Sequence, residues 1–307
     1  MGTARHARRG RSGREFPGDL QVGKRYLVVT ADDYGIGPAT SRGILDLAEQ
    51  GRVTCAVLLV NSPYALKGVQ DWERSGKPME LGWHPCLTMD PPLVQAEQVP
   101  SLVGADGCLW PLGRFMARWF LGRLRAAEIH AELQAQYRRF IELVGHPPTV
   151  VNSHQHTQLF APVGDILLDI LSTQTPLPYV RQVRESPAML MRIRGARIKR
   201  AFLSFHGGRA GRKQRSAGFP GNDALAGITD PPYVTDPNFF VRWLARIKGD
   251  LVELACHPGY YDETLIGRDC TATDGRLERR VHELQLLSQP TYVKACRQGG
   301  FALEHAA

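Results

Sequence analysis

Four short segments of the chain carry side chains that could bind a metal ion and move protons. Their acidic and imidazole residues are Asp32, Asp33, His84, His154, His156 and His257. One Asp and two His offer a cation hard and borderline ligands and leave positions open for water, which suits Zn²⁺ and also Mg²⁺ or Mn²⁺. Such a cation makes its water more acidic and polarises a carbonyl, while a second carboxylate accepts the proton and an imidazole protonates a leaving amine. These residue types predict a metal-dependent hydrolase that cleaves an amide.

Each of the four segments directly follows a short apolar run that is typical of a buried strand. The runs and the residues after them are Tyr26–Thr30 before Asp32 and Asp33, Met79–Trp83 before His84, Thr149–Asn152 before His154 and His156, and Leu251–Cys256 before His257. In a closed parallel barrel the carboxyl ends of the strands meet on one face, where the active sites of that fold occur. We therefore expect these residues to converge, although they are far apart in the sequence.

Each segment taken alone has a plainer interpretation. The Asp32-Asp33 pair could form a turn, because Asp tolerates left-handed backbone geometry, and His84 before Pro85 could be an ordinary loop histidine. His154 and His156 are separated by one residue, which in an extended segment would point both rings the same way. The common position at strand ends is what favours a single site.

The elements that must position these residues alternate along the chain. Helical patterns cover about 38–51, 63–76, 127–144, 163–171, 238–247 and 276–287, and further strands are expected at 54–60 and 179–183. Alternating strands and helices imply a parallel sheet with right-handed crossovers, and 307 residues suit one barrel. The prediction is an α/β fold with a TIM-like (β/α) barrel, as one domain over residues 25–307 behind a basic tail at 1–24.

The positive charge is concentrated in one segment. The chain carries a net charge of +8, and residues 186–222 contain nine Lys or Arg and no Asp or Glu. This basic insertion indicates an anionic substrate, a phosphate-bearing carrier or a membrane surface. The other interpretation is a solvated, partly disordered insertion.

Several classes of protein are not supported. No apolar run approaches the roughly 20 residues of a membrane helix, and no signal-peptide core is present, so we expect a cytoplasmic protein. The six cysteines are scattered without a C-x-x-C pair, which predicts free thiols. The sequence has no G-x-S-x-G elbow and no nucleotide-binding glycine motif.

These motifs together resemble the YdjC-like carbohydrate deacetylases, a family that includes a chitooligosaccharide deacetylase. The resemblance lies in T-A-D-D-Y-G from Thr30, G-W-H-P-C-L-T from Gly82, N-S-H-Q-H from Asn152 and C-H-P-G from Cys256, in that order. It implies an incomplete barrel of about seven strands and metal-dependent removal of the N-acetyl group from an amino sugar. By motif, the metal ligands would be Asp33, His84 and His154, the general base Asp32, the acid or oxyanion-side helper His257, and the residues lining the site or behind it His156, Asn152, Arg181 and Tyr34.

Two departures from the family pattern affect the expected substrate. Asn152 stands where the family commonly has Asp, so we expect a different orientation of His154, and Tyr34 replaces the commoner Phe. The basic insertion favours an anionic or carrier-linked N-acetyl sugar. The alternatives are a metal-dependent hydrolase of another amide or of a phosphate ester, and a non-catalytic protein that binds glycans or nucleic acid, although we expect no nucleic acid partner. A homodimer stays open.

Overall fold

The computed structural model describes residues 25–306 and contains one parallel sheet. The tail predicted at 1–24 lies outside the described residues. The strand order along the sheet is β5-β4-β3-β2-β1-β7-β6, and β8 pairs with β1 beside this path. The strands are β1 (Arg25–Tyr34), β2 (Cys55–Leu58), β3 (Glu80–Trp83), β4 (Val150–Val151), β5 (Tyr179–Val180), β6 (Ala224–Ala226), β7 (Leu251–Cys256) and β8 (Phe301–Leu303).

The sheet curls into an incomplete barrel, as the resemblance implied. Its path has seven strands, and among the described residues no ladder pairs β5 with β6. The gap is narrow, because the Val180 N–H donates to Pro220 O at 2.9 Å and the Leu225 N–H donates to Arg184 O at 3.1 Å. The α/β barrel prediction is therefore confirmed.

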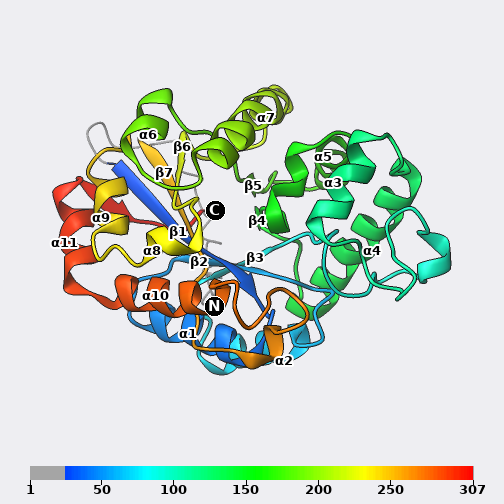
Figure 1. The fold of residues 1–307 in the computed structure, drawn as a ribbon, viewed down its shortest axis with the longest axis horizontal. Helices are drawn as coiled ribbons and strands as arrows, with labels where there is room; N and C mark the ends of the chain where they lie inside the picture. Colours follow the sequence, from blue (N-terminus) through cyan, green and yellow to red (C-terminus); the bar gives the residue numbers. More distant parts are fainter. Residues whose placement is uncertain (1–24, 307) are drawn as a thin grey trace, which may run out of the picture.

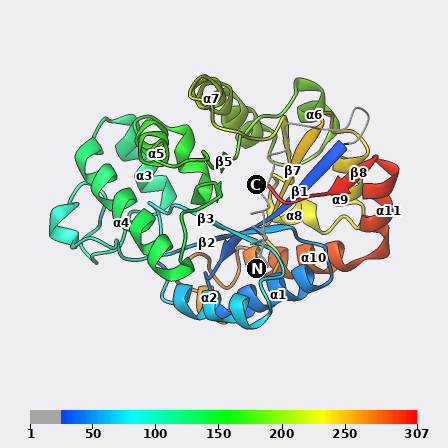
Figure 2. The ribbon, with the colours of Figure 1, turned by 180° about the vertical axis from the view of Figure 1, so that it is seen from behind.

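Helices surround the sheet on its outer side, so that the strands lie at the centre of the molecule (Figures 1 and 2). They are α1 (Pro38–Glu49), α2 (Ala65–Arg74), α3 (Leu112–Phe120), α4 (Ala126–Val144), α5 (Val163–Leu171), α6 (Pro187–Arg192), α7 (Arg197–Ser216), α8 (Pro231–Val234), α9 (Phe239–Leu244), α10 (Arg276–Ser288) and α11 (Pro290–Gln298). Short 3-10 turns span Ala96–Gln98, His154–Leu159 and Glu263–Leu265. None of the described helices is both long enough and apolar enough to cross a membrane.

The central strand β1 carries a distortion where its chemistry lies. The register between β1 and β2 shifts between Ala31 and Tyr34, and Asp33 within this bulge has a left-handed φ of 65°. A bulge re-aims side chains that would otherwise alternate between the two faces. It explains how the adjacent Asp32 and Asp33 both reach one pocket while contacting different partners.

Helix α4 holds the loop that follows β3. The side-chain oxygen of Gln136 accepts from the Cys86 N–H at 2.9 Å, and its amide nitrogen donates to Cys86 O at 2.6 Å. The Glu132 carboxylate accepts from the N–H groups of Leu93 and Val94. Both side chains are fully buried. This clamp fixes the backbone two residues after His84.

The basic insertion is helical rather than partly disordered, which corrects that interpretation. Helix α7 buries a stripe of residues made of Arg200, Leu203, Gly207, Gly211 and Gln214 against the sheet side. A Cβ at Gly207 would lie 1.8 Å from Val183 O, so glycine permits close contact with the strand end. Strands β6 and β8 were not predicted, because three residues carry too little periodicity to be recognised.

Candidate active site

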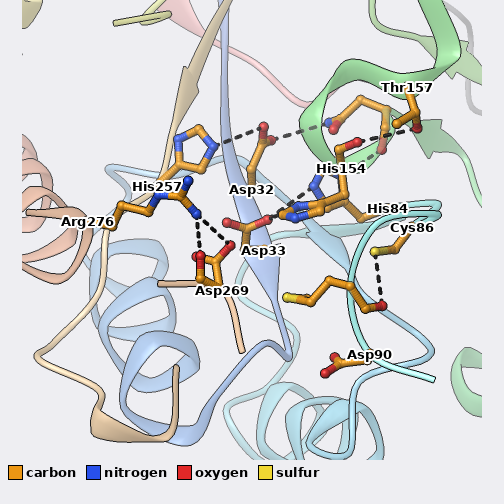
Figure 3. Close-up of polar contacts among 12 residues, drawn as sticks. Asp32, Asp33, His84, Cys86, Asp90, His154, Thr157, His257, Asp269 and Arg276 are labelled. Carbon is orange, nitrogen blue, oxygen red and sulfur yellow. Dashed lines mark hydrogen bonds and ion pairs between the residues drawn. The ribbon is translucent and has the colours of Figure 1, made fainter. Parts of the chain in front are cut away.

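Asp33, His84 and His154 come together as a buried group of potential metal ligands. Asp33 Oδ1 lies 3.3 Å from His84 Nε2 and 2.9 Å from His154 Nδ1. One ligand atom from each residue lies within 4.8 Å of the other two, and at most 4% of any of the three residues is exposed. The prediction that these three converge is confirmed, and Figure 3 shows them beside the end of β1.

The hydrogen bonds around this group determine which nitrogen lone pairs could coordinate a cation. His84 Nδ1 lies 2.7 Å from Asn152 O, and a carbonyl can only accept, so Nδ1 carries the proton and Nε2 keeps its lone pair toward Asp33. Burial disfavours a charged imidazole, but Asp33 beside it raises the pKa of His154. A cation entering this group would therefore displace a proton from His154. The donor set fits a divalent metal ion.

The other oxygen of Asp33 is held by an arginine. Arg280 on α10 donates from Nη2 to Asp33 Oδ2 at 2.6 Å and to Asp269 Oδ2 at 3.2 Å. Burial alone would raise the pKa of Asp33, but Arg280 and His154 hold it well below its ordinary value. Asp33 is thus ionised, with one oxygen facing the two imidazoles and the other facing a guanidinium.

Asp32 sits in a separate buried ion-pair network. Arg181 after β5 donates from Nη1 and Nη2 to the two oxygens of Asp32 at 2.7 and 2.8 Å, and from Nε to Glu253 Oε1 at 2.8 Å. The Tyr179 hydroxyl donates to Glu253 Oε2 at 2.9 Å. Burial would raise the pKa of Asp32, but the Arg181 guanidinium offsets this and brings it below the ordinary value. Asp32 is therefore ionised at neutral pH, beside the three potential ligands.

His257 lies on the opposite side of Asp32 from His84 and His154 (Figure 3). Its Nε2 is 3.8 Å from Asp32 Oδ2, and 30% of its side chain is exposed toward the pocket. Its Nδ1 lies 3.2 Å from Nη2 of Arg279, whose Nε donates to Glu283 at 2.7 Å. Burial first and Arg279 second lower the pKa of His257 well below its ordinary value. His257 is therefore neutral.

Comparison with known proteins identifies the family of this chain. The family model described as YdjC-like protein matches residues 26–298. The chain belongs to the YdjC-like family. It is 27% identical over 285 residues to a chitooligosaccharide deacetylase of Klebsiella pneumoniae (strain 342), an alignment covering 91% of this chain and 97% of the relative. It is 26% identical over 281 residues to a protein of the same name in Yersinia pestis (strain Pestoides F), with the same shares covered.

A solved structure shares the fold of this YdjC-like chain. It is described as a putative cellobiose-phosphate cleavage protein of Enterococcus faecalis V583, and it superposes with a TM-score of 0.71 at 22% identity. The match covers 92% of this chain and 98% of that chain. The incomplete barrel is thus the fold of a full-length neighbour as well.

A pocket of about 390 Å³ opens over the two aspartates. Its polar side contains Asp32, His154 and His257 together with cations from α7 and α10. Its apolar wall comes from α3, α7 and two connecting segments and consists of Leu112, Met116, Phe160, Phe202, Leu203 and Ile228. The YdjC-like site therefore combines ionisable groups with an apolar wall in one pocket.

Two residues of the third motif differ from expectation. His154–Leu159 is a 3-10 turn with left-handed Gln155 and His156, so the segment is not extended and only His154 faces Asp33. His156 still lines the pocket, and burial and Arg181 lower its pKa to about 3. The backbone carbonyl of Asn152 contacts His84, and its side-chain Nδ2 donates to Asp32 Oδ1 at 3.4 Å. Asn152 therefore does not orient His154.

Tyr34 is not part of the pocket lining. Its ring is fully buried, and its hydroxyl donates to Gly68 O at 2.7 Å, which connects the end of β1 to α2. The hydroxyl that distinguishes Tyr34 from Phe thus forms a structural hydrogen bond and does not face the pocket. Arg181 is also fully buried, so it contacts Asp32 and not a substrate.

Sequence reasoning missed the side chains that hold the site from behind. Arg279, Arg280 and Glu283 lie on α10, and Glu253 lies within β7. A signal was available for three of them. Glu253 interrupts the apolar run of its strand, and Arg280 and Glu283 fall on the buried stripe of α10 together with Leu277 and Leu287. A charge at a core position indicates a partner, because unpaired buried charge is costly.

Proposed function

We propose that this chain is a carbohydrate N-deacetylase that hydrolyses the N-acetyl group of an amino sugar with the help of a divalent cation. The observation that carries the proposal is the placement of Asp32 and His257 beside the buried group of Asp33, His84 and His154 in one pocket. The two named relatives, aligned over nearly their whole length, support the class of substrate.

Asp33, His84 and His154 would hold the cation through Oδ1, Nε2 and Nδ1. When bound there, Zn²⁺ or Mg²⁺ would make a water molecule more acidic and polarise the amide carbonyl. Arg280 keeps the far oxygen of Asp33 occupied, which leaves Asp33 to offer one oxygen. The Asn152 carbonyl keeps the proton of His84 on the nitrogen that faces away.

Asp32 would accept the proton of the attacking water and pass it to the leaving amine nitrogen, so that the proton taken up in attack is returned when the C–N bond breaks. The bidentate contact with Arg181 fixes its plane and keeps it ionised, so it is available as an acceptor across the working pH range. The same contact makes it a weaker base, because its conjugate acid is disfavoured. As a weak base, Asp32 would deprotonate a water whose pKa the bound cation lowers, rather than a water in bulk solvent.

His257 would act as a hydrogen-bond donor to the carbonyl oxygen. Arg279 can only donate, so Nδ1 of His257 accepts and Nε2 carries the proton toward the pocket. Charge develops on the carbonyl oxygen during attack, and a fixed donor aimed at it stabilises the transition state. Of the two roles expected for His257, this geometry supports the oxyanion-side one.

The test measures acetyl loss by mass spectrometry and acetate release. The full chain is stripped of metal, reloaded with Zn²⁺ or Mg²⁺, and given N-acetylglucosamine oligosaccharides, glycosides and lipid-linked forms, with N-acetyl amino acids and a phosphate ester for comparison. We expect metal-dependent acetate release from the sugars. Asp32→Asn should retain metal and lose roughly 10²–10⁴-fold in kcat, whereas Asp46→Asn on exposed α1 should behave as the parent.

Two results would contradict the proposal. Cleavage of another amide or of a phosphate ester, with no acetate from any N-acetyl sugar, would make the chain a different hydrolase. Salt-sensitive binding of RNA or DNA without metal-dependent turnover would make it a binding protein.

The anionic or carrier-linked nature of the substrate stays a prediction. The apolar wall of the pocket favours a substrate with an apolar group next to the sugar.

A further inference from the structure

Helix α7 presents an unusual surface on the side away from the core. Its buried stripe is Arg200, Leu203, Gly207, Gly211 and Gln214, and at 100° per residue the opposite side is occupied by Ile198, Phe202, Phe205, Arg209 and Arg212. We call these five residues the α7 face. Ile198 is 89% exposed, Phe205 58% and Phe202 43%. Large apolar side chains side by side on a surface mark a binding site more often than single ones do.

The α7 face is continuous with the active-site pocket. Phe202 belongs both to the face and to the pocket wall. Its ring lies 5.9 Å from that of Phe160, another wall residue, and 4.7 Å from His206. The ring of Trp119 at the end of α3 lies 5.9 Å from His206, and the exposed Phe120 and Leu121 follow directly. The apolar surface therefore spans α3 and α7 at the edge of the pocket.

The charges around this apolar surface are almost all positive. Of the nine cations in residues 186–222, Arg200 pairs with Glu185 and Lys213 with Asp165. Within residues 25–306, no carboxylate lies at ion-pair distance from the other seven, which are Arg192, Arg194, Arg197, Lys199, Arg209, Arg212 and Arg215. The Arg209 guanidinium lies 4.4 Å from the centre of the Phe205 ring, so basic and apolar groups are interleaved.

We propose that the α7 face docks the enzyme on an anionic phospholipid surface, with the pocket entrance beside the bilayer. Apolar side chains next to exposed Lys and Arg are the combination that enters the headgroup region and attracts acidic lipids. A second copy of the chain fits the face poorly, because it would bring like charges together. Nucleic acid could stack on the Phe202 and Phe205 rings but would gain little from Ile198, the most exposed residue of the face, which has no ring.

The test is sedimentation of the full chain with vesicles, which does not depend on catalysis. Vesicles of phosphatidylcholine alone are compared with vesicles of phosphatidylcholine and phosphatidylglycerol. We expect binding to the anionic vesicles only, and weaker binding at high salt, since surface attraction is screened. Residues 1–24 are also basic, so the parent chain alone does not locate the contact, and variants of the face are needed.

Two pairs of variants separate the face from the rest of the chain. Ile198→Ser with Phe205→Ser should reduce the partition coefficient at least about tenfold. Leu66→Ser, at a residue that is 51% exposed against 58% for Phe205, should not reduce it, because it lies on α2, on the opposite side of the molecule from α7 (Figures 1 and 2). Arg209→Gln with Arg212→Gln should reduce it about tenfold at low salt. Lys294→Gln with Arg297→Gln on α11 removes the same charge elsewhere and should leave it within about twofold.

The proposal is overturned if anionic vesicles do not bind the chain, or if the face variants bind them as the parent does while their thermal melting is unchanged. It is also overturned if the same variants abolish a dimer seen by sedimentation velocity, or a salt-sensitive shift of RNA, without changing vesicle binding. Loss of vesicle binding in both face variants, with both controls retained, supports it whatever bond the enzyme cleaves.

Discussion

Arg279 donates from Nη2 to Nδ1 of His257 at 3.2 Å, and this contact decides which nitrogen of the imidazole carries a proton. Glu283, one turn further along α10, fixes the guanidinium through one carboxylate oxygen. Its other carboxylate oxygen accepts from the His257 backbone N–H. Ring and backbone of His257 are thus held by two residues of a single helix. A histidine beside a guanidinium is disfavoured as a cation, so the neutral form of His257 is favoured.

Replacement of this arginine gives the first prediction. In Arg279→Gln the pKa of His257 should rise, because burial remains but the neighbouring positive charge is gone. Titration of the imidazole followed by NMR measures this rise. If neutral His257 is the working form, activity is lost as the pH falls through its pKa, so the acid limb of kcat/KM should move to higher pH.

Arg276→Gln is the matched control, because Arg276 lines the same pocket but lies near Asp269 and Asp274. It should leave the acid limb in place. An alkaline limb that moves upward in Arg279→Gln, with activity extended to higher pH, would mean that His257 works as a protonated acid instead.

The second prediction concerns metal affinity. Asp33→Ala or His84→Ala removes one of three ligands and should abolish stoichiometric metal in the purified chain. His156→Ala should retain it, because His156 lines the pocket without facing Asp33. Metal analysis after dialysis measures both. Full metal content in Asp33→Ala would remove this group from consideration as the metal site.

Arg280 gives a third prediction, about stability. In Arg280→Met the buried Asp33 carboxylate loses its guanidinium partner, and the chain without metal should lose about 3–5 kcal/mol of unfolding free energy. A divalent cation can replace the missing positive charge, so added metal should restore more stability to the variant than to the parent. Chemical denaturation in chelator and in metal compares the two.

Arg42→Met is the control for this effect. Arg42 pairs with Asp46 on the exposed surface of α1, and its replacement should leave the unfolding free energy nearly unchanged with or without metal, because solvent screens the pair. Equal metal stabilisation of Arg280→Met and the parent would show that Arg280 and the cation do not share Asp33.

Two neighbouring glycines of α7 give the fourth prediction. Gly207→Ala places a Cβ 1.8 Å from Val183 O and should lower the unfolding free energy by about 1–3 kcal/mol or more. Gly208→Ala meets nothing within 4 Å and should raise it by up to about 1 kcal/mol, because alanine favours the helix. Thermal melting distinguishes them. The same effect for both would mean that α7 is not packed against the strand end in solution.

The local sequence by itself determined the alternation of strands and helices and the position of the reactive residues. Helix α5 has the bounds that its apolar spacing predicts, and α4 begins one residue before the predicted start and ends before Gly145, whose φ is 87°. Asp32, His84, His154 and His257 each lie at or near the carboxyl end of a strand, and the parallel sheet brings these ends together. The order of the strands depends on how they pair in space. The reactive residues meet at one edge of the sheet in any order, because all the strands run in the same direction.

Only the tertiary structure decided which partners each of those residues contacts. The bulge at Asp33 turns two adjacent carboxylates toward different partners. The sequence indicated that Asp tolerates a left-handed backbone, but not that this conformation would occur inside a strand as a bulge. Arg181 and Arg279 reach the site from the end of β5 and from α10, and the acceptors that they contact, Asp32 and the His257 ring, could not be assigned from the sequence. The basic insertion likewise packs as a helix because Gly207 lets the backbone of α7 lie close to Val183. Charge pairing and close backbone contact depend on distance in space, which the order of residues along the chain does not contain.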